Sequence, residues 1–162
     1  MSGVVAGLVA SVKSAPSGPV NLVLNPSFTA DSIDGWSGSG NVGLARQTAL
    51  FRTAPAGLQF FGIEDLPNVS YYRGEVLTVG QSYSLSLYLQ ALGEQSYTIK
   101  FYAGDTITTL TTPTKTANTW HNFKIENVSC VGNTSFIVEI NSDYDTYVDD
   151  VSVVQGATAL VL

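Results

Sequence analysis

The chain has 162 residues, only 12% of which are charged, and Asp and Glu outnumber Lys and Arg by 13 to 7 for a formal net charge of -6. Such an acidic chain lacks the positive footprint of a nucleic-acid-binding protein, and no stretch is apolar over the length that a membrane span needs. We therefore expect that the protein binds neither nucleic acid nor a membrane. The length fits one domain, and low charge with abundant Gly, Ser, Thr, Val and Tyr is typical of an all-β protein.

The first residues, MSGVVAGLVASVKSAPSGP, contain a short apolar run and then a connector with Pro and Ser. They resemble a signal peptide only superficially, because no basic residue precedes the run and Lys13 interrupts the chain directly after it. The run either packs on its own domain or docks on a neighbouring subunit. We expect an N-terminal arm or anchor over 1–19, a β-sandwich domain over 20–155 and an apolar tail over 156–162. Two apolar ends favour a place inside an assembly.

In chain order, the first strand is predicted over residues 20–24, where Asn25-Pro26 ends it. Phe28 and Trp36 are expected to fill the core, the latter directly after the turn signal Asp34-Gly35. Further strands are predicted over 42–51, 57–62, 69–79, 120–128, 136–140 and 147–154, with short strands in the threonine-rich stretch 106–119.

The clearest pattern covers residues 81–104. Apolar and polar residues alternate from Tyr83 to Ala91 and again from Tyr97 to Ala103. Because strand side chains alternate between the two faces of a sheet, this predicts a β-hairpin with one apolar face buried. Its other face bears Tyr88, Gln90, Lys100 and Tyr102, and further candidates are Tyr71, Tyr72, Arg73 and Trp120. These side chains either form a platform for sugar rings, or Tyr88 and Tyr102 pack beneath a loop or against a neighbouring subunit.

The predicted strands recur roughly every eight to twelve residues with turn signals between them, which favours an antiparallel β-sandwich. The expected fold class is all-β, a jelly roll with an extended N-terminal arm. Cys130 is the single cysteine, so no internal disulfide exists, and its neighbours Val128 and Val131 predict a buried thiol.

Short motifs succeed one another in an order that resembles a known family. They are Asn21-Leu-Val-Leu-Asn25-Pro-Ser-Phe28, Gly35-Trp36, Leu77-Thr-Val-Gly-Gln-Ser-Tyr-Ser-Leu-Ser-Leu-Tyr88, Trp120-His-Asn-Phe123 and Tyr147-Val-Asp-Asp-Val-Ser-Val153. Over roughly residues 20–154 this succession is similar to the carbohydrate-binding modules of families four, nine and twenty-two. The resemblance implies a galactose-binding-like jelly roll that is non-catalytic and often holds a structural calcium. It also implies a possible context in bacteriophage heads, tails and fibres, where such domains are reused.

The family's opening motif usually has a Glu after the Phe, whereas this chain has Thr29, which leaves Asp149 as the candidate calcium ligand. The segment NSDYDTYVDD lacks the spacing of an EF-hand loop. Strand alternation also predicts that Asp149 and Asp150 lie on opposite sides of a strand. The alternative to calcium is that Asp149 accepts hydrogen bonds from loop backbone near Asn25.

Catalysis has little support in the sequence. The single histidine, His121, shares its parity with Phe123 and Ile125 in a predicted strand. The chain has no G-x-S-x-G motif, metal-binding His pair or phosphate loop, so we expect a protein that is not an enzyme.

Two functions remain in view. The first is a structural subunit of a bacteriophage virion, a decoration or tail protein on the virion surface, whose arm and tail contact other virion subunits and further copies of itself. The second is an extracellular carbohydrate-binding module that binds polysaccharide through an aromatic face.

Overall fold

The computed structural model describes residues 19–39, 42–62 and 68–162, which form ten strands in two antiparallel sheets. Sheet A has the order β1-β4-β9-β6-β7, and sheet B has the order β2-β3-β10-β5-β8. The strands are β1 (Trp36–Gly38), β2 (Val42–Gln47), β3 (Gly57–Gly62), β4 (Asn68–Glu75), β5 (Ser82–Ala91), β6 (Thr98–Ala103), β7 (Thr106–Thr111), β8 (His121–Ser129), β9 (Ser135–Ser142) and β10 (Thr146–Gln155). The all-β sandwich is therefore confirmed. No helix among the described residues could cross a membrane.

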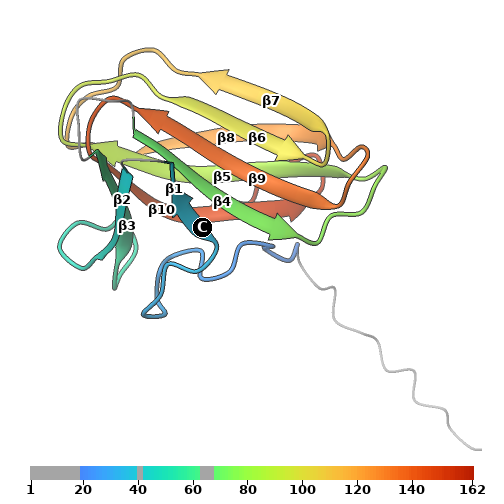
Figure 1. Cartoon of the computed structure of the whole chain (residues 1–162), viewed down its shortest axis with the longest axis horizontal. Helices are drawn as coiled ribbons and strands as arrows, with labels where there is room; N and C mark the ends of the chain where they lie inside the picture. The colour runs from blue at the N-terminus through green and yellow to red at the C-terminus, as the bar shows by residue number, and fades with distance from the viewer. Residues whose placement is uncertain (1–18, 40–41, 63–67) are drawn as a thin grey trace, which may run out of the picture.

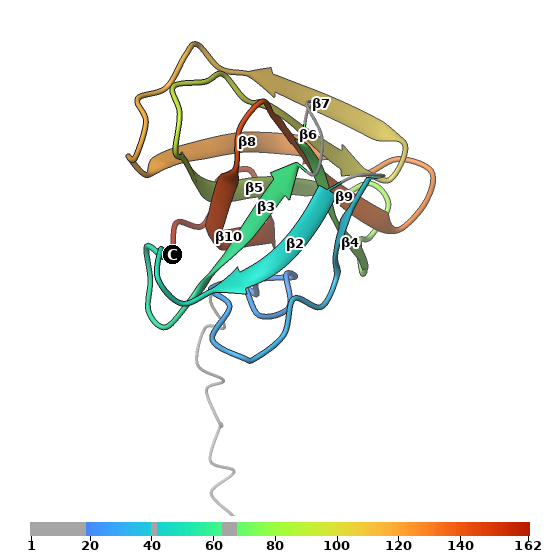
Figure 2. The same cartoon turned by 60° about the vertical axis from the view of Figure 1, so that its left-hand side comes forward.

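The two sheets stack face to face, and β4, β9, β6 and β7 lie in front of β8, β5 and β10 in Figure 1. Turning the molecule brings β2 and β3 forward in Figure 2. The core lies between the layers because each central strand turns its apolar parity inward. In β5, for example, Leu85, Leu87 and Leu89 are fully buried, and Ile99 and Phe101 of β6 meet them from the other sheet.

The predicted hairpin over residues 81–104 is wrong. Strand β5 lies between β10 and β8 in sheet B, whereas β6 lies between β9 and β7 in sheet A. The chain between them therefore crosses from one layer to the other. Two amphipathic strands can bury their apolar faces by pairing in one sheet or by facing each other across a core, and alternation is the same in both cases.

The predicted first strand is also absent, since residues 20–24 form no strand. This segment runs beside β10, where the Leu22 N–H donates to the Val153 carbonyl at 2.8 Å. The Asn21 side chain bonds the Val151 carbonyl and the Val153 N–H, at 2.9 Å each. A side-chain amide thus satisfies backbone groups that a strand ladder would otherwise pair. The burial predicted for Phe28, Trp36 and Cys130 is confirmed.

The tail over 156–162 packs against its own domain. The Ser152 hydroxyl donates to the Leu160 carbonyl, and the Ala159 N–H donates to Glu126 at 2.9 Å. The predicted arm over 1–19 lies outside the described residues except for Pro19, so both alternatives for its docking stay predictions.

Candidate functional site

The predicted binding residues are divided between the two outer faces of the sandwich and the core. Arg73, Lys100 and Tyr102 lie on the outer face of sheet A, opposite in parity to the buried residues of β4 and β6. Tyr88 and Gln90 lie on the outer face of sheet B, and Trp120 is half-buried just before the edge strand β8. The expected single platform for these residues is therefore not formed.

Tyr72 is a core residue and only 1% exposed. Its ring packs between Trp36 and Phe136, with centroid distances of 5.4 and 5.7 Å. Its hydroxyl accepts a hydrogen bond from the Leu24 N–H at 2.8 Å. The prediction that Tyr72 contacts sugar is therefore wrong, since its parity turns the ring into the sandwich. Tyr71 pairs through its backbone with Glu139 of β9, and its side chain is not among those that the structure describes.

The outer face of sheet A carries a polar cluster centred on Glu139 in β9. Lys100 donates to Glu139 Oε1 at 2.7 Å, and Asn141 donates to the same oxygen at 2.9 Å. The Tyr102 hydroxyl donates to Glu139 Oε2 at 3.0 Å. The arrangement follows from the antiparallel register, which sets Lys100 directly opposite Glu139 and Tyr102 opposite Ile137. We call Glu139, Lys100, Tyr102 and Asn141 the Glu139 cluster.

The carboxylate of Glu139 is held in its charged form. Burial of the group raises its pKa, but hydrogen bonds from Lys100, Asn141 and Tyr102 and the charge of Lys100 lower it, and the net shift is downward. A carboxylate has acceptor sites for about four donors, and three described side chains use them.

This cluster has the chemistry that a sugar requires. A half-buried tyrosine ring offers an apolar surface for C–H groups, and the carboxylate, ammonium and amide beside it can exchange hydrogen bonds with hydroxyl groups. The side chains also hold one another in place, which reduces the ordering cost of binding.

The outer face of sheet B is arranged differently, because a loop covers part of it. The Arg52 guanidinium lies 3.7 Å above the Tyr88 ring centroid and pairs with the buried carboxylate of Asp150. Gln90 is buried as well, and no described residue satisfies its Oε1. Tyr88 therefore packs beneath a loop, as one of the two interpretations of its sequence predicted.

The two aspartates of β10 meet at this loop. Backbone N–H groups of Arg52 and Thr53 each donate to Asp149 Oδ2 at 2.8 Å, and the Thr53 hydroxyl donates to Asp150 at 2.7 Å. The prediction that the aspartates point to opposite sides is wrong, because a β-bulge interrupts the register of β10 and Asp150 has a φ of 49°. Asp149 does accept hydrogen bonds from loop backbone, but the donors are residues 52 and 53 and not the loop near Asn25. The Ser27 hydroxyl, close to Asn25 in the sequence, donates to Asp150 at 2.7 Å.

Asp149 is fully buried, and burial raises its pKa to about 6. Hydrogen bonds from the backbone of Thr53, Asp150 and Arg52 oppose that rise, and the neighbouring charge of Asp150 adds to it.

These residues do not fit the structural calcium that the family resemblance implies. Calcium needs six to eight oxygen ligands that converge on one point, but both oxygens of Asp149 accept backbone N–H bonds. The oxygens of Asp150 accept bonds from Ser27, Thr53 and Arg52. Among the described residues, no group of three or more His, Cys, Asp or Glu side chains could hold a metal ion. The guanidinium of Arg52 supplies the positive charge instead.

Sequence reasoning missed Glu139, Asn141 and Arg52. For the first two a signal exists, because SFIVEINS alternates and places both residues opposite the apolar parity of Phe136 and Val138. For Arg52 there is none, since its partner in the loop contact is almost a hundred residues away.

The amino-acid sequence matches no protein-family model and none of the curated proteins searched.

Solved structures do resemble the fold. TmCBM61 in complex with β-1,4-galactotriose has a TM-score of 0.65 at 16% identity, over 85% of this chain and 99% of that module. The CBM22-1 xylan-binding domain from Paenibacillus barcinonensis has a TM-score of 0.67 at 15% identity, over 90% of this chain and all of that domain (100%). The enzymatically active domain of tailspike protein 4 from bacteriophage CBA120 has a TM-score of 0.63 at 14% identity, over 84% of this chain but 21% of its own. The chain therefore has the jelly-roll fold seen in carbohydrate-binding modules.

Proposed function

We propose that the protein is a non-catalytic carbohydrate-binding module that binds polysaccharide on the outer face of sheet A. The observation that carries the proposal is the Glu139 cluster, in which a tyrosine ring, a carboxylate, an ammonium and an amide lie together on one face. Arg73 extends the same face from β4, because its register partner Ile137 is also the partner of Tyr102.

The expected ligand is a neutral, β-linked polysaccharide such as β-1,4-galactan or xylan. Two structural neighbours are described with ligands of this kind, β-1,4-galactotriose and xylan. A chain with a net charge of -6 would repel a strongly acidic polysaccharide at long range. The neutral hydroxyls of these sugars suit the mixed donors and acceptors of the Glu139 cluster.

A matched pair of tyrosine variants tests the proposal. Tyr102 and Tyr88 are both half-buried and lie on opposite outer faces. Titration calorimetry with soluble xylan and β-1,4-galactan should show measurable binding by the unmodified chain. Tyr102→Ala should weaken it about tenfold, which corresponds to about 1.4 kcal/mol of lost contact, and Tyr88→Ala should leave it within about twofold. Loss of binding in Tyr88→Ala alone would place the site on sheet B, and no binding by the unmodified chain to either sugar would refute the ligand class.

A structural role on the surface of a bacteriophage virion is the second candidate. Its support is the likeness to one domain of a phage tailspike protein together with the apolar run at the start of the sequence. An antibody against the domain should then label intact particles in electron micrographs of the producing culture. A protein found only free in the medium would instead support the extracellular module.

A further inference from the structure

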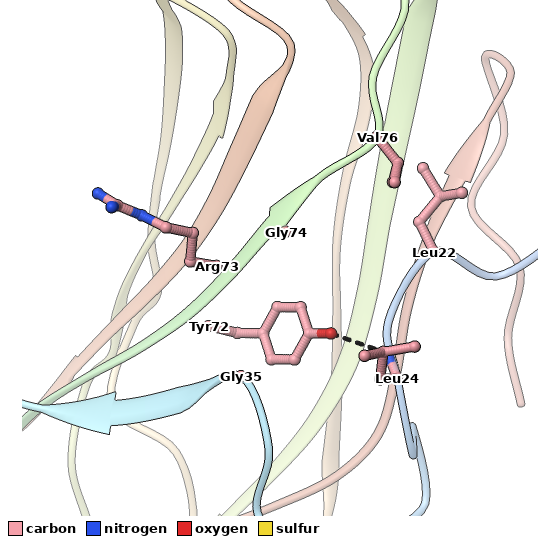
Figure 3. A pocket seen from close by; sticks show the side chains of 7 residues that line it. All are labelled: Leu22, Leu24, Gly35, Tyr72, Arg73, Gly74 and Val76. Atoms are coloured by element: carbon pink, nitrogen blue, oxygen red, sulfur yellow. Dashed lines mark hydrogen bonds between the residues drawn. The ribbon is translucent and has the colours of Figure 1, made fainter.

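A pocket of about 410 Å³ opens where the N-terminal segment meets β4. Its walls are Leu22, Leu24, Gly35, Tyr72, Arg73, Gly74 and Val76. Figure 3 shows the side chains of Leu22, Leu24 and Val76 gathered on one side of the Tyr72 hydroxyl, while the Arg73 guanidinium points away. The side chains gathered at this side of the pocket are thus aliphatic.

Two polar groups at this pocket already have partners. The Tyr72 hydroxyl accepts the Leu24 N–H at 2.8 Å, and the Arg73 N–H donates to the Gly35 carbonyl at 3.1 Å. A sugar would therefore find few hydrogen-bonding partners here and would lose those that it makes with water. Aliphatic side chains are the better occupant, because they gain from burial alone.

The pocket continues into exposed apolar surface. Leu24 is 68% exposed and Val76 is 58% exposed, and Val20, two residues before Leu22, is 68% exposed. Single exposed aliphatic residues need no explanation, but several beside an apolar pocket are typical of an interaction site.

The sequence supplies an occupant of matching chemistry. Residues 4–12, VVAGLVASV, contain Val4, Val5, Leu8, Val9 and Val12 and no charge. Residues 13–18 separate this run from Pro19, and an extended chain of that length spans about 20 Å. We propose that the pocket binds the apolar run 4–12 of a second copy of this chain, so that the module self-associates by exchanging N-terminal arms.

The sequence of the connector favours a second copy over the same chain. To reach its own pocket the run would have to turn back between Val12 and Leu22. The connector SAPSGP has Ala15 before Pro16 and Gly18 before Pro19, and a residue that precedes proline prefers extended backbone. Pro-rich connectors act as extended spacers of about 3.1 Å per residue. These preferences oppose such a reversal and favour binding to a neighbouring domain.

Disulfide trapping in the full chain distinguishes the occupants. The double variant Leu8→Cys/Val76→Cys, oxidised at micromolar concentration, should run as a dimer or larger species without reductant and as a monomer with reductant. The control Leu8→Cys/Ile107→Cys places the second thiol on an exposed residue of β7 and should form less than one tenth as much crosslinked product. Monomers with an internal disulfide would show that the arm occupies its own pocket, and equal crosslinking in both variants would show that the pocket does not select it. Either result overturns the proposal.

Light scattering gives an independent test. Val76→Asp places a charge at the pocket, whereas Val79→Asp places the same charge on a residue that is 50% exposed but is no part of the pocket wall. The first variant should weaken self-association at least tenfold, and the second should leave it within twofold. Circular dichroism should show that both stay folded. A monomeric unmodified chain at high micromolar concentration, or equal effects of the two variants, would refute the exchange of arms.

Discussion

Replacing Arg52 with Ala should destabilise the domain more than the loss of any ordinary surface ion pair. The Arg52 side chain is 30% exposed, whereas the Asp150 carboxylate that it pairs with is fully buried. The variant leaves that carboxylate with the hydrogen bonds from Ser27 and Thr53 but without its ion-pair partner. A buried charge without a counter-charge is the costly case, because both the folded environment and the loss of water disfavour it.

The magnitude follows from this geometry. Breaking a buried ion pair from one side costs about 3–5 kcal/mol, and partial exposure of Arg52 places the value at the lower end because water screens the pair. Loss of the guanidinium from the Tyr88 ring adds about 0.5–1 kcal/mol. We expect a decrease of about 3.5–4 kcal/mol in the free energy of unfolding, which for a chain of this size lowers Tm by about 7–16 °C.

Urea denaturation followed by tryptophan fluorescence measures the effect. Asp31→Ala is the control, because it breaks the pair between Arg46 and a carboxylate that is 98% exposed and should cost less than about 1 kcal/mol. Arg52→Met/Asp150→Asn should be more stable than the sum of the two single changes predicts, since the double variant removes both charges. A loss below about 1 kcal/mol in Arg52→Ala would show that the pair contributes little.

Three further predictions concern the same clusters. Asp149 has a folded-state pKa of about 6, raised from 3.8, so its protonation favours the folded state at low pH and that stability is lost as pH rises through 6. The unfolding free energy should therefore fall by about 2 kcal/mol between pH 4 and pH 7, and Asp149→Asn should remove this slope even though it lowers stability throughout. Addition of calcium at millimolar concentration, or its removal with a chelator, should shift Tm by less than about 1 °C. A calcium-dependent rise of several degrees would contradict the conclusion that the residues around Asp149 and Asp150 do not fit a calcium ion. Glu139→Gln should weaken polysaccharide binding about tenfold. Because the pKa of Glu139 is lowered from its ordinary value of 4.5, the unmodified chain should keep more than half of its binding at pH 4.5. A loss of half the binding at that pH would mean that the pKa of the carboxyl group is not lowered.

Alternation in the sequence predicted most strands and which parity is buried, since burial of one face is a local consequence of the strand period. The burial of Leu85, Leu87 and Leu89 in β5 follows from it directly. Alternation could not show which strands are neighbours. The same alternation is expected whether β5 and β6 pair as a hairpin or lie in opposite sheets that face each other across the core. Which arrangement forms depends on the long-range pairing of β5 with β10 and of β6 with β9.

The candidate site was partly predictable for the same reason. Lys100 and Tyr102 were found because they share the outward parity of one strand. Glu139 was missed because its role depends on the register between β6 and β9, which joins residues almost forty positions apart. Tyr72 was misplaced because two adjacent tyrosines in a strand point to opposite faces, and nothing local shows which one faces the core.

Both ends of the described chain lie against β10: the Leu22 N–H bonds Val153, and the Leu160 carbonyl bonds Ser152. Strand β10 belongs to sheet B, whereas the Glu139 cluster lies on the outer face of sheet A. A tether attached at either end therefore joins the domain beside β10, a strand of the sheet that does not carry the Glu139 cluster. A module immobilised on a solid support through such a tether would present its polar, tyrosine-bearing face to the solution.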